Sequence, residues 1–357
     1  MRKEYAIIPA MSEKIATAEV LQEWKFLHNS QVTPLGTGLI NDTFLVTSPQ
    51  NERFVLQRVH PIFASSVNDD IHQVTTHLVH KDIRTPTLVR TQRGELCCVH
   101  QDRVWRLLTY IHGVALDKVD SPDRAFHAGQ LVANWHHALT DFSYDYVHVR
   151  AGVHDTGRHL RVLEDAVNSH ANHRLYDMVA PVADALLKAG HALAPLAQMR
   201  RWHAHGDLKL SNLLFDATSQ QGLCLVDLDT VTTMPWVWEL GDALRSWCNP
   251  LGENVTEAKV DRAILQSAIK GYARIAGSIV DQDERDLLVD GLATIATELA
   301  ARFLGDALNE QYFGWDSSRF ATRGEHNLLR AKGQWSLAQD VLRSRDELRA
   351  LIVSSFG

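Results

Sequence analysis

The sequence has few cysteines and no long hydrophobic run. Its 357 residues include four cysteines, none of them in a CxxC pair: Cys97, Cys98, Cys224 and Cys248. A disulfide framework and a zinc site are therefore not expected, and this usage fits reduced thiols in a cytosolic protein. No window approaches the roughly 18 apolar residues that a membrane helix needs, and the first residues lack a signal peptide's apolar core. We expect a cytoplasmic protein without a membrane partner.

The sequence also lacks a large excess of charge of either sign. Lys and Arg number 36 and Asp and Glu number 43, which gives a net charge of −7 and a pI near 6.2. No global field therefore favours nucleic acid, and we expect no nucleic-acid partner. HEXXH motifs, internal repeats and low-complexity tracts are absent as well. The 45% hydrophobic content is ordinary for a globular protein, which can be a monomer or a homodimer.

The first third of the chain has mostly strand character. Residues 12–28 read as an amphipathic helix because apolar residues recur at helical spacing. Short β-branched and aromatic runs follow at 31–35, 43–48, 53–59 and 103–111, with a further hairpin expected from 86–91 and 96–99 around a turn at 92–94. The pattern predicts a small β-rich N-terminal lobe over residues 1–110.

The rest of the chain has mostly helical character. A helix is expected to start at Ser121-Pro122-Asp123, and helical patterns dominate again from residue 255. Short strand-like runs at 213–215 and 223–227 interrupt them. We therefore predict a bilobal α+β fold whose larger, α-helical C-terminal lobe spans 111–357, with a hinge near 109–113.

A catalytic-loop motif is present at residues 205–212, which read HGDLKLSN. The spacing matches the H-x-D-L-K-x-x-N loop of kinases. In that pattern Asp207 orients an acceptor hydroxyl and takes its proton, and Lys209 offsets charge on the transferring phosphoryl group. Asn212 binds Mg²⁺ through its amide oxygen, and His205 braces the loop. The loop therefore predicts a phosphotransferase that uses ATP and Mg²⁺.

Carboxylates follow this loop at the end of an apolar run, L223-C-L-V-D-L-D229. Asp227 occupies the position of the metal-binding aspartate that follows such a loop, and Asp229 is a second candidate ligand. Further along, Asp242 reads as a residue at a helix N-terminus, where it can accept backbone N–H bonds from its helix or from the catalytic loop. We expect it to brace the site from behind, with a helix N-cap as the alternative.

Nucleotide contacts are expected from the β-rich lobe. A glycine turn at Gly36, Thr37 and Gly38 lets backbone N–H groups approach a phosphate. In the strand that follows, Arg58 can neutralise the α- and β-phosphates, held by either Asp69 or Asp70. Adenine is expected to bond to the backbone near Thr109, Tyr110 and Ile111.

These motifs resemble the aminoglycoside phosphotransferase/choline kinase superfamily, whose fold is like that of protein kinases. The resemblance is closer to the N-acetylhexosamine 1-kinase-like branch and covers residues 36 to about 327. It rests on G38-L-I-N-D-T-F-L-V46, V55-L-Q-R58, W105-R106, Y110-I-H-G113, H154-D-T156 with Arg158, D207-x-K209, R302-F-L304, Y312-F313 and E325-H-N327. The sequence departs from the branch at 227–235, where threonines are inserted, and at Asp69-Asp70, where Glu-Asn is usual.

The resemblance implies transfer of the γ-phosphate of ATP to a sugar hydroxyl, typically at the anomeric carbon. It carries Asp42, Arg302 and Tyr312 over as candidate sugar-binding residues. Other readings stay open: a different acceptor (an amino alcohol, homoserine, methylthioribose or an aminoglycoside), or a nucleotide-binding pseudokinase. A protein kinase is disfavoured because no activation segment with an APE-type ending follows Asp227.

Overall fold

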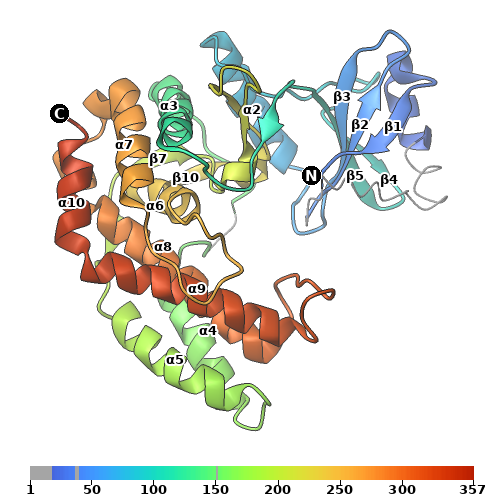
Figure 1. Cartoon of the computed structure of the whole chain (residues 1–357). Helices are drawn as coiled ribbons and strands as arrows, with labels where there is room; N and C mark the ends of the chain where they lie inside the picture. The colour runs from blue at the N-terminus through green and yellow to red at the C-terminus, as the bar shows by residue number, and fades with distance from the viewer. Residues whose placement is uncertain (1–17, 37–39, 150–151) are drawn as a thin grey trace. The chain divides into compact units, whose positions relative to one another are not determined.

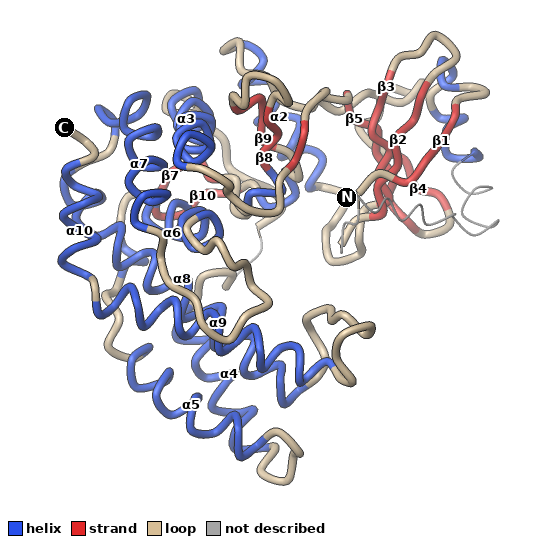
Figure 2. Tube along the Cα trace, in the orientation of Figure 1, coloured by secondary structure: helices blue, strands red, loops and turns tan. Residues whose placement is uncertain are grey.

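The N-terminal region forms an antiparallel sheet because its short runs alternate between apolar and polar residues. The computed structural model describes residues 18–36, 40–149 and 152–357. Five strands pair in the order β1-β2-β3-β5-β4 (Figures 1 and 2): β1 (Gln31–Pro34), β2 (Asp42–Thr47), β3 (Arg53–Arg58), β4 (Cys98–His100) and β5 (Arg103–Thr109). Helix α2 (Val67–His80) follows β3. The strands predicted over 31–35, 43–48, 53–59 and 103–111 are confirmed, with ends that differ by one or two residues.

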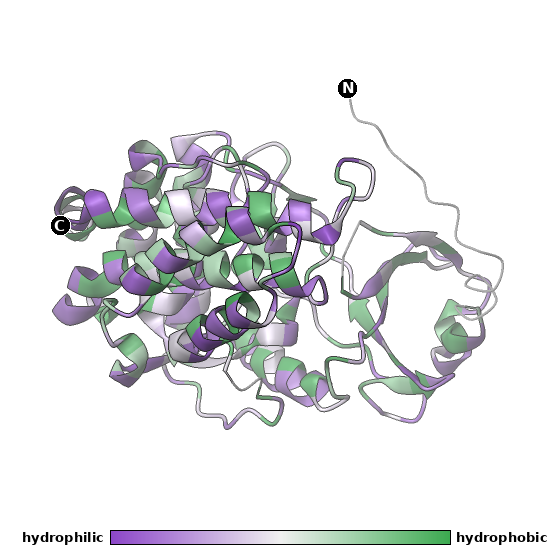
Figure 3. Ribbon diagram, turned by 90° about the horizontal axis from the view of Figure 1, so that it is seen from below, coloured by the Kyte–Doolittle hydropathy of each residue, from purple (hydrophilic) through white to green (hydrophobic). Residues whose placement is uncertain are grey.

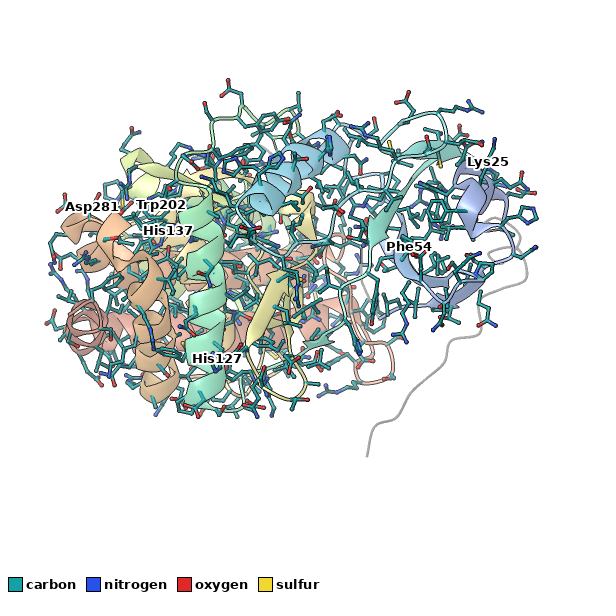
Figure 4. The ribbon with its side chains drawn as sticks, turned by 90° about the horizontal axis from the view of Figure 1, so that it is seen from above. Lys25, Phe54, His127, His137, Trp202 and Asp281 are labelled. Carbon is teal, nitrogen blue, oxygen red and sulfur yellow. The ribbon has the colours of Figure 1, made fainter. Side chains whose placement is uncertain are left out.

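The predicted regular helix over residues 12–28 is wrong where the structure describes it, and residues 12–17 lie outside the described residues. A short helical piece at 18–20 leads into two 3₁₀ turns, η1 (Leu21–Glu23) and η2 (Lys25–Leu27). Residues three apart also share a side in 3₁₀ geometry, so the apolar face still packs on the sheet. Its buried members are Val20, Leu21, Trp24 and Leu27. Figure 4 labels Lys25 of η2 and Phe54 of β3.

The predicted hairpin of 86–91 and 96–99 is also wrong. Residues 92–94 do turn sharply, with Gly94 N–H donating to Thr91 O at 2.9 Å, but 86–91 contributes a single bridge instead of a strand. The real hairpin joins β4 to β5 through Gln101 and Asp102, whose φ angles are 50° and 57°. Two positive φ angles at a two-residue connection match the twist of the strands, and this turn therefore sets the register.

The remaining elements are mostly helices, and the helix start predicted at Ser121 is confirmed because its Oγ accepts from Arg124 N–H at 3.2 Å. The helices are α3 (Pro122–Ala138), α4 (Thr156–Ser169), α5 (Tyr176–Gly190), η3 (Leu196–Gln198), η4 (Leu210–Asn212), η5 (Leu228–Thr230), α6 (Trp236–Trp247), α7 (Arg262–Ala276), η6 (Gly277–Ile279), α8 (Gln282–Asn309), α9 (Arg323–Arg343) and α10 (Arg345–Ser354). The strands β6 (Val114–Ala115), β8 (Leu213–Phe215) and β9 (Gly222–Leu225) form one small sheet, and β7 (Arg201–Ala204) and β10 (Thr232–Pro235) another.

Helix α8 is the central helix of this region and packs against α4, α5, α6, α9 and α10. Figure 3 shows hydrophilic and hydrophobic residues alternating along the helices. The approach of α6 to α8 is close enough to require glycine on both helices. A Cβ at Gly291 would lie 2.1 Å from Val237 O, and one at Gly241 would lie 2.8 Å from the backbone of Gly291. This contact fixes the α6 residues relative to those of α8.

Contacts divide the chain into two compact units that are not continuous in sequence. The first unit comprises Met1–His112, Phe142–Val149 and Val226–Val231, and the second comprises Gly113–Asp141, Arg150–Leu225 and Thr232–Gly357. The lobes at 1–110 and 111–357, and the hinge between them, stay predictions. In the part of the chain that the structure describes, no helix is both long and apolar enough to cross a membrane.

Candidate active site

The loop between β7 and β8, in the second unit, carries the predicted catalytic residues. Lys209 Nζ lies 2.7 Å from Asp207 Oδ2. The Asn212 amide nitrogen donates to the backbone oxygen of Asp207 at 2.8 Å and to its Oδ2 at 3.1 Å. The structure therefore brings Asp207, Lys209 and Asn212 together, with the Asn212 amide oxygen turned away from the aspartate.

Glu239 of α6 holds the start of this loop. Its Oε1 accepts from the N–H of His205 at 2.7 Å, and its Oε2 accepts from the N–H of Gly206 at 3.1 Å. Glu239 and His205 are both buried, and His205 Nδ1 also accepts from Asp207 N–H at 3.3 Å. A buried carboxylate with two backbone donors fixes the turn from which Asp207 projects. Sequence reasoning missed Glu239, although an acid between Trp238 and Leu240 at the apolar start of α6 is a signal.

The prediction that Asp242 lies at a helix N-terminus and accepts backbone bonds is wrong. Helix α6 begins six residues earlier, at Trp236, and Asp242 accepts from Arg245 Nε at 3.0 Å and from a terminal nitrogen at 2.8 Å. Burial raises the pKa of Asp242, but the charge and hydrogen bonds of Arg245 outweigh burial and lower it. The charges of His154 and Lys209 lower this pKa further, which places all these groups in one neighbourhood.

Glu298 of α8 is a second residue that sequence reasoning missed. This buried carboxylate accepts from Thr156 Oγ1 at 2.5 Å and lies 3.0 Å from His154 Nδ1. Burial is the main cause that lowers the pKa of His159, with Glu298 raising it and Arg302 lowering it. Glu298 and Arg302 therefore act on the same histidine, and the predicted sugar-binding arginine lies in the neighbourhood of the H154-D-T156 motif.

Arg302 lies over two aromatic rings. Its guanidinium carbon is 5.7 Å from the ring centroid of Tyr312 and 5.3 Å from that of Phe313. Asp306 accepts from the N–H groups of residues 311–313 at 2.8–2.9 Å and so fixes the segment that carries both rings. Among the described residues no carboxylate pairs with Arg302. The guanidinium is thus positioned by cation–π contacts, and the residue Tyr312 beside it is 58% exposed.

In the first unit, Asp227 and Asp229 have different environments. Asp227 has left-handed backbone angles, with φ 65° and ψ 58°, and is half-buried. Asp229 is 2% exposed, and its carboxylate accepts from Arg106 at 2.5 and 2.9 Å and from Asn41 at 2.5 Å. Asp229, one of the three predicted metal ligands, is therefore bound by protein groups.

The expectation that Asp69 or Asp70 holds Arg58 is wrong. Arg58 Nε lies 2.7 Å from Asp42 Oδ2, because the two residues are directly opposite in the β2–β3 register. Asp70 is fully buried and accepts three hydrogen bonds of 2.8–2.9 Å from the segment 142–149, and Asp69 is exposed. The predicted sugar ligand Asp42 is thus the carboxylate that orients the predicted phosphate ligand.

The sequence model of the phosphotransferase enzyme family matches residues 31–277, more than half of the chain. The chain belongs to this family. It is a small-molecule phosphotransferase with a hydroxyl acceptor, and the predicted superfamily is confirmed.

Solved structures agree with this phosphotransferase assignment at the level of the fold. A microcompartment-associated aminopropanol kinase is 17% identical with TM-score 0.63, covering 93% of this chain and 98% of its own. An aminoglycoside phosphotransferase from Alicyclobacillus acidocaldarius is 14% identical with TM-score 0.63, covering 92% and 96%. Amicoumacin kinase hAmiN, solved with AMP-PNP and Ca²⁺, is 14% identical with TM-score 0.59, covering 89% and 96%. The predicted α+β, protein-kinase-like fold is confirmed.

The phosphotransferase offers oxygen ligands for a divalent cation. Within residues 18–36, 40–149 and 152–357, no three His, Cys, Asp or Glu residues gather as a metal cluster. Asn212 keeps its amide oxygen directed away from Asp207, and Asp227 supplies a half-buried carboxylate. Mg²⁺ prefers such hard oxygens and completes its shell with phosphate and water, so each of these two groups, taken within its own unit, has the chemistry of a Mg²⁺ ligand.

The remaining predicted nucleotide contacts are only partly described. Gly36 has φ 76°, which glycine adopts without strain, while Thr37 and Gly38 lie outside the described residues. Thr109 ends β5, and its N–H and Oγ1 bond to the backbone of Thr87 at 2.9 Å. Tyr110 and Ile111 follow as half-buried irregular backbone. Their roles toward phosphate and adenine stay predictions.

Proposed function

We propose that this phosphotransferase transfers the γ-phosphate of ATP, with Mg²⁺, to a hydroxyl of a small sugar, most specifically an N-acetylhexosamine or related hexose at its anomeric position. The observation that carries the chemistry is the loop in which Asp207 lies 2.7 Å from Lys209 Nζ and accepts from Asn212. Phosphoryl transfer depends mainly on positioning and charge stabilisation, and Glu239 fixes the loop that provides both.

Each side chain of the loop has a separate task in this proposal. Asp207 orients the acceptor hydroxyl and accepts its proton, while Lys209 offsets negative charge on the transferring group. Asn212 and Asp227 hold the metal, which supplies positive charge to the phosphates when bound. Arg58, oriented by Asp42, contacts the nucleotide phosphates. Asp229, the third expected ligand, is already paired with Arg106.

Arg302 supports a sugar over a polycationic acceptor. An aminoglycoside site needs carboxylates that meet several ammonium groups. Here two acids of the second unit are already held by protein groups, Asp242 by Arg245 and Glu298 by His154. The guanidinium over Tyr312 instead offers N–H donors to hydroxyl or carbonyl oxygens beside an exposed ring. Because a flat sugar face packs well on an aromatic ring, this pair suits a neutral hexose.

The proposal is tested by measuring Mg²⁺-dependent ATP consumption against free hexoses, N-acetylhexosamines, amino alcohols and aminoglycosides, with the product identified by mass. Asp207→Ala is expected to lower turnover by roughly 10²–10⁴-fold while the protein stays folded. A sugar phosphate that is lost in the variant and is labile to mild acid supports transfer to the anomeric oxygen. Phosphorylation of an amino alcohol alone would overturn the sugar assignment, and nucleotide binding without turnover on any acceptor would favour a pseudokinase.

A further inference from the structure

Arg106 of β5 is the centre of a buried polar cluster in the first unit. Arg106 donates to Gln57 of β3, Asn68 of α2 and Asp229 of η5, and Asn41 before β2 joins the cluster by donating to Asp229. Arg106, Asn68 and Asp229 are 1–2% exposed and Asn41 is 7% exposed. Most of these residues belong to the sequence motifs that pointed to the fold, yet the proposed reaction assigns none of them a contact with substrate.

Every N–H of the Arg106 guanidinium has an acceptor. Nε donates to Gln57 Oε1 at 2.8 Å, and one terminal nitrogen donates to the same oxygen at 2.7 Å and to Asp229 Oδ2 at 2.9 Å. The other donates to Asp229 Oδ1 at 2.5 Å and to Asn68 Oδ1 at 3.4 Å. An arginine has five donors, and here all five are used. This guanidinium is therefore committed to protein contacts.

Both carboxylate oxygens of Asp229 are likewise occupied by hydrogen bonds from protein groups. Both of its oxygens face Arg106, and Oδ2 also accepts from Asn41 Nδ2 at 2.5 Å. Asn41 is tied down in turn, because its Oδ1 accepts from His60 N–H at 2.8 Å. A carboxylate that is 2% exposed and paired in this way would have to leave a buried arginine unpaired in order to ligate a metal.

Asp227 lies two residues earlier in a conformation that needs support. Its φ of 65° belongs to the left-handed region, which is costly for a residue with a Cβ although aspartate tolerates it better than most. Such a backbone persists where the surrounding structure over-determines it. The ion pair at Asp229 anchors the chain immediately beyond this turn.

We propose that Arg106 and Asp229 form a buried clasp that positions Asp227, so that Asp229 is a positioning residue and not a metal ligand. The inference rests on the proposed function because Asp227 is taken there as the metal-binding carboxylate. Of the two acids in the D-L-D sequence, one faces the cation and the other anchors the turn.

The clasp is tested by the Mg²⁺ dependence of AMP-PNP binding, measured by calorimetry together with the melting temperature. The variants are Asp229→Asn, Arg106→Met and the double variant Arg106→Met/Asp229→Leu. Breaking one side of a buried pair leaves an unpaired charge, whereas replacing both sides with apolar residues often restores stability. Asp227→Asn serves as the ligand control. Asp340→Asn breaks a buried aspartate–arginine pair between α7 and α9 that has no proposed role at the site.

We expect each single variant to melt lower by about 5 °C or more and to need about tenfold more Mg²⁺ for half-maximal binding. The double variant should recover most of both losses, while Asp340→Asn lowers only the melting temperature. Asp229 is a ligand after all if the double variant shifts the Mg²⁺ midpoint as far as Asp227→Asn does. A purely structural role follows if the single variants, like Asp340→Asn, melt lower with an unchanged midpoint. Either result overturns the clasp.

A measurement on the wild-type protein covers the case in which the variants do not fold. Crystals grown with Mn²⁺ and AMP-PNP locate the cation by its anomalous signal. The clasp requires manganese bound to Asp227 with Asp229 still paired to Arg106, and an Asp229 oxygen in the coordination sphere would refute it. Wild-type protein that binds no nucleotide in a Mg²⁺-dependent manner would instead contradict the proposed function, and the two failures are thereby separated.

Discussion

Arg106 in the first unit and Arg302 in the second are both held in fixed positions, but by opposite means. Arg106 is 1% exposed and donates all five of its guanidinium N–H groups to side-chain oxygens. Arg302 is half-buried over Tyr312 and Phe313, with no carboxylate partner among the described residues. A guanidinium whose donors are saturated can only support the protein, whereas one fixed by ring faces keeps its donors for a ligand.

Three buried carboxylates of this phosphotransferase resemble Arg106, because their oxygens are occupied by hydrogen bonds from protein groups. Glu239 accepts from the backbone N–H groups of the catalytic loop, Asp306 from those of residues 311–313, and Asp70 from those of residues 147 and 148. Each is buried, and each fixes a segment of irregular backbone. The contrast with Arg302 leads to predictions about which changes reduce stability and which reduce acceptor binding.

The largest effect is expected from Glu239→Ala, which removes the carboxylate that accepts from the N–H groups of buried His205 and half-buried Gly206. Two such unpaired donors cost about 2–6 kcal/mol of unfolding free energy. A displacement of Asp207 by about 1 Å should lower turnover roughly 10²-fold. Both are measured by denaturant unfolding and steady-state kinetics. Glu239→Gln keeps one acceptor oxygen, so its stability and turnover should lie between those of the wild type and of Glu239→Ala. Full turnover in Glu239→Ala would show that Glu239 does not hold the catalytic loop in place.

The second prediction concerns His326 of α9. Its Nδ1 accepts at 3.1 Å from the N–H of Asp316, which lies in the segment between α8 and α9. Burial, reinforced by the charges of Arg330 and Arg319 and opposed by Asp316, lowers the pKa of His326 to about 4.

The folded protein thus favours the neutral ring, and this contribution is complete above the unfolded pKa of about 6.5 and is lost as pH falls toward 4. Between pH 7 and 5 the unfolding free energy should drop by up to about 2 kcal/mol from this group. The acceptor KM should rise because the same segment carries Tyr312. His326→Gln should lack this pH-dependent component, and an identical pH profile in that variant would contradict the assignment.

The third prediction is that Arg302→Met raises the acceptor KM about tenfold, the value of one charged hydrogen bond, with the KM for ATP and the melting temperature unchanged. Arg302→Lys keeps a cation over the rings but loses the planar fork, so its KM should be intermediate. A lower melting temperature in Arg302→Met would show that this arginine stabilises the protein as Arg106 does. The contrast between the two arginines would then be wrong.

The sequence predicts the catalytic loop and the first sheet because their signals lie in the identity and spacing of the side chains themselves. The loop at 205–212 and the D-L-D sequence have fixed spacing, and the strands of the first sheet show regular alternation. The members of the Arg106 cluster, too, are polar residues at otherwise apolar positions of recognisable motifs. Their pairing, however, depends on register between distant strands, which the pattern does not supply.

The residues that sequence reasoning missed bind backbone groups. Glu239 and Asp306 accept from N–H groups that any residue presents, so no partner side chain identifies them. Of the threonines read as an insertion in 227–235, Thr232 and Thr233 lie in β10, which pairs with β7 some thirty residues earlier. A four-residue strand is too short for periodicity to reveal, and its pairing is decided by tertiary contacts.

The smallest effect is expected from Trp247→Phe at the end of α6. Trp247 is buried, and its Nε1 donates to Leu208 O at 2.8 Å, one residue after the proposed base. Loss of this bond should cost about 1 kcal/mol of unfolding free energy and lower turnover a few-fold, because the loop keeps Glu239 as its main anchor.

Trp236→Phe is the matched control for this change. Trp236 is also buried, begins the same helix, and donates from Nε1 to Tyr272 Oη at 2.8 Å, and Tyr272 is not a residue of the catalytic loop. Both variants lose one buried indole hydrogen bond and should lose similar stability. Only Trp247→Phe should also lose turnover, since only its partner belongs to the loop. Equal turnover losses in the two variants would mean that activity follows the general packing of α6, and Glu239 would then be one contact among many.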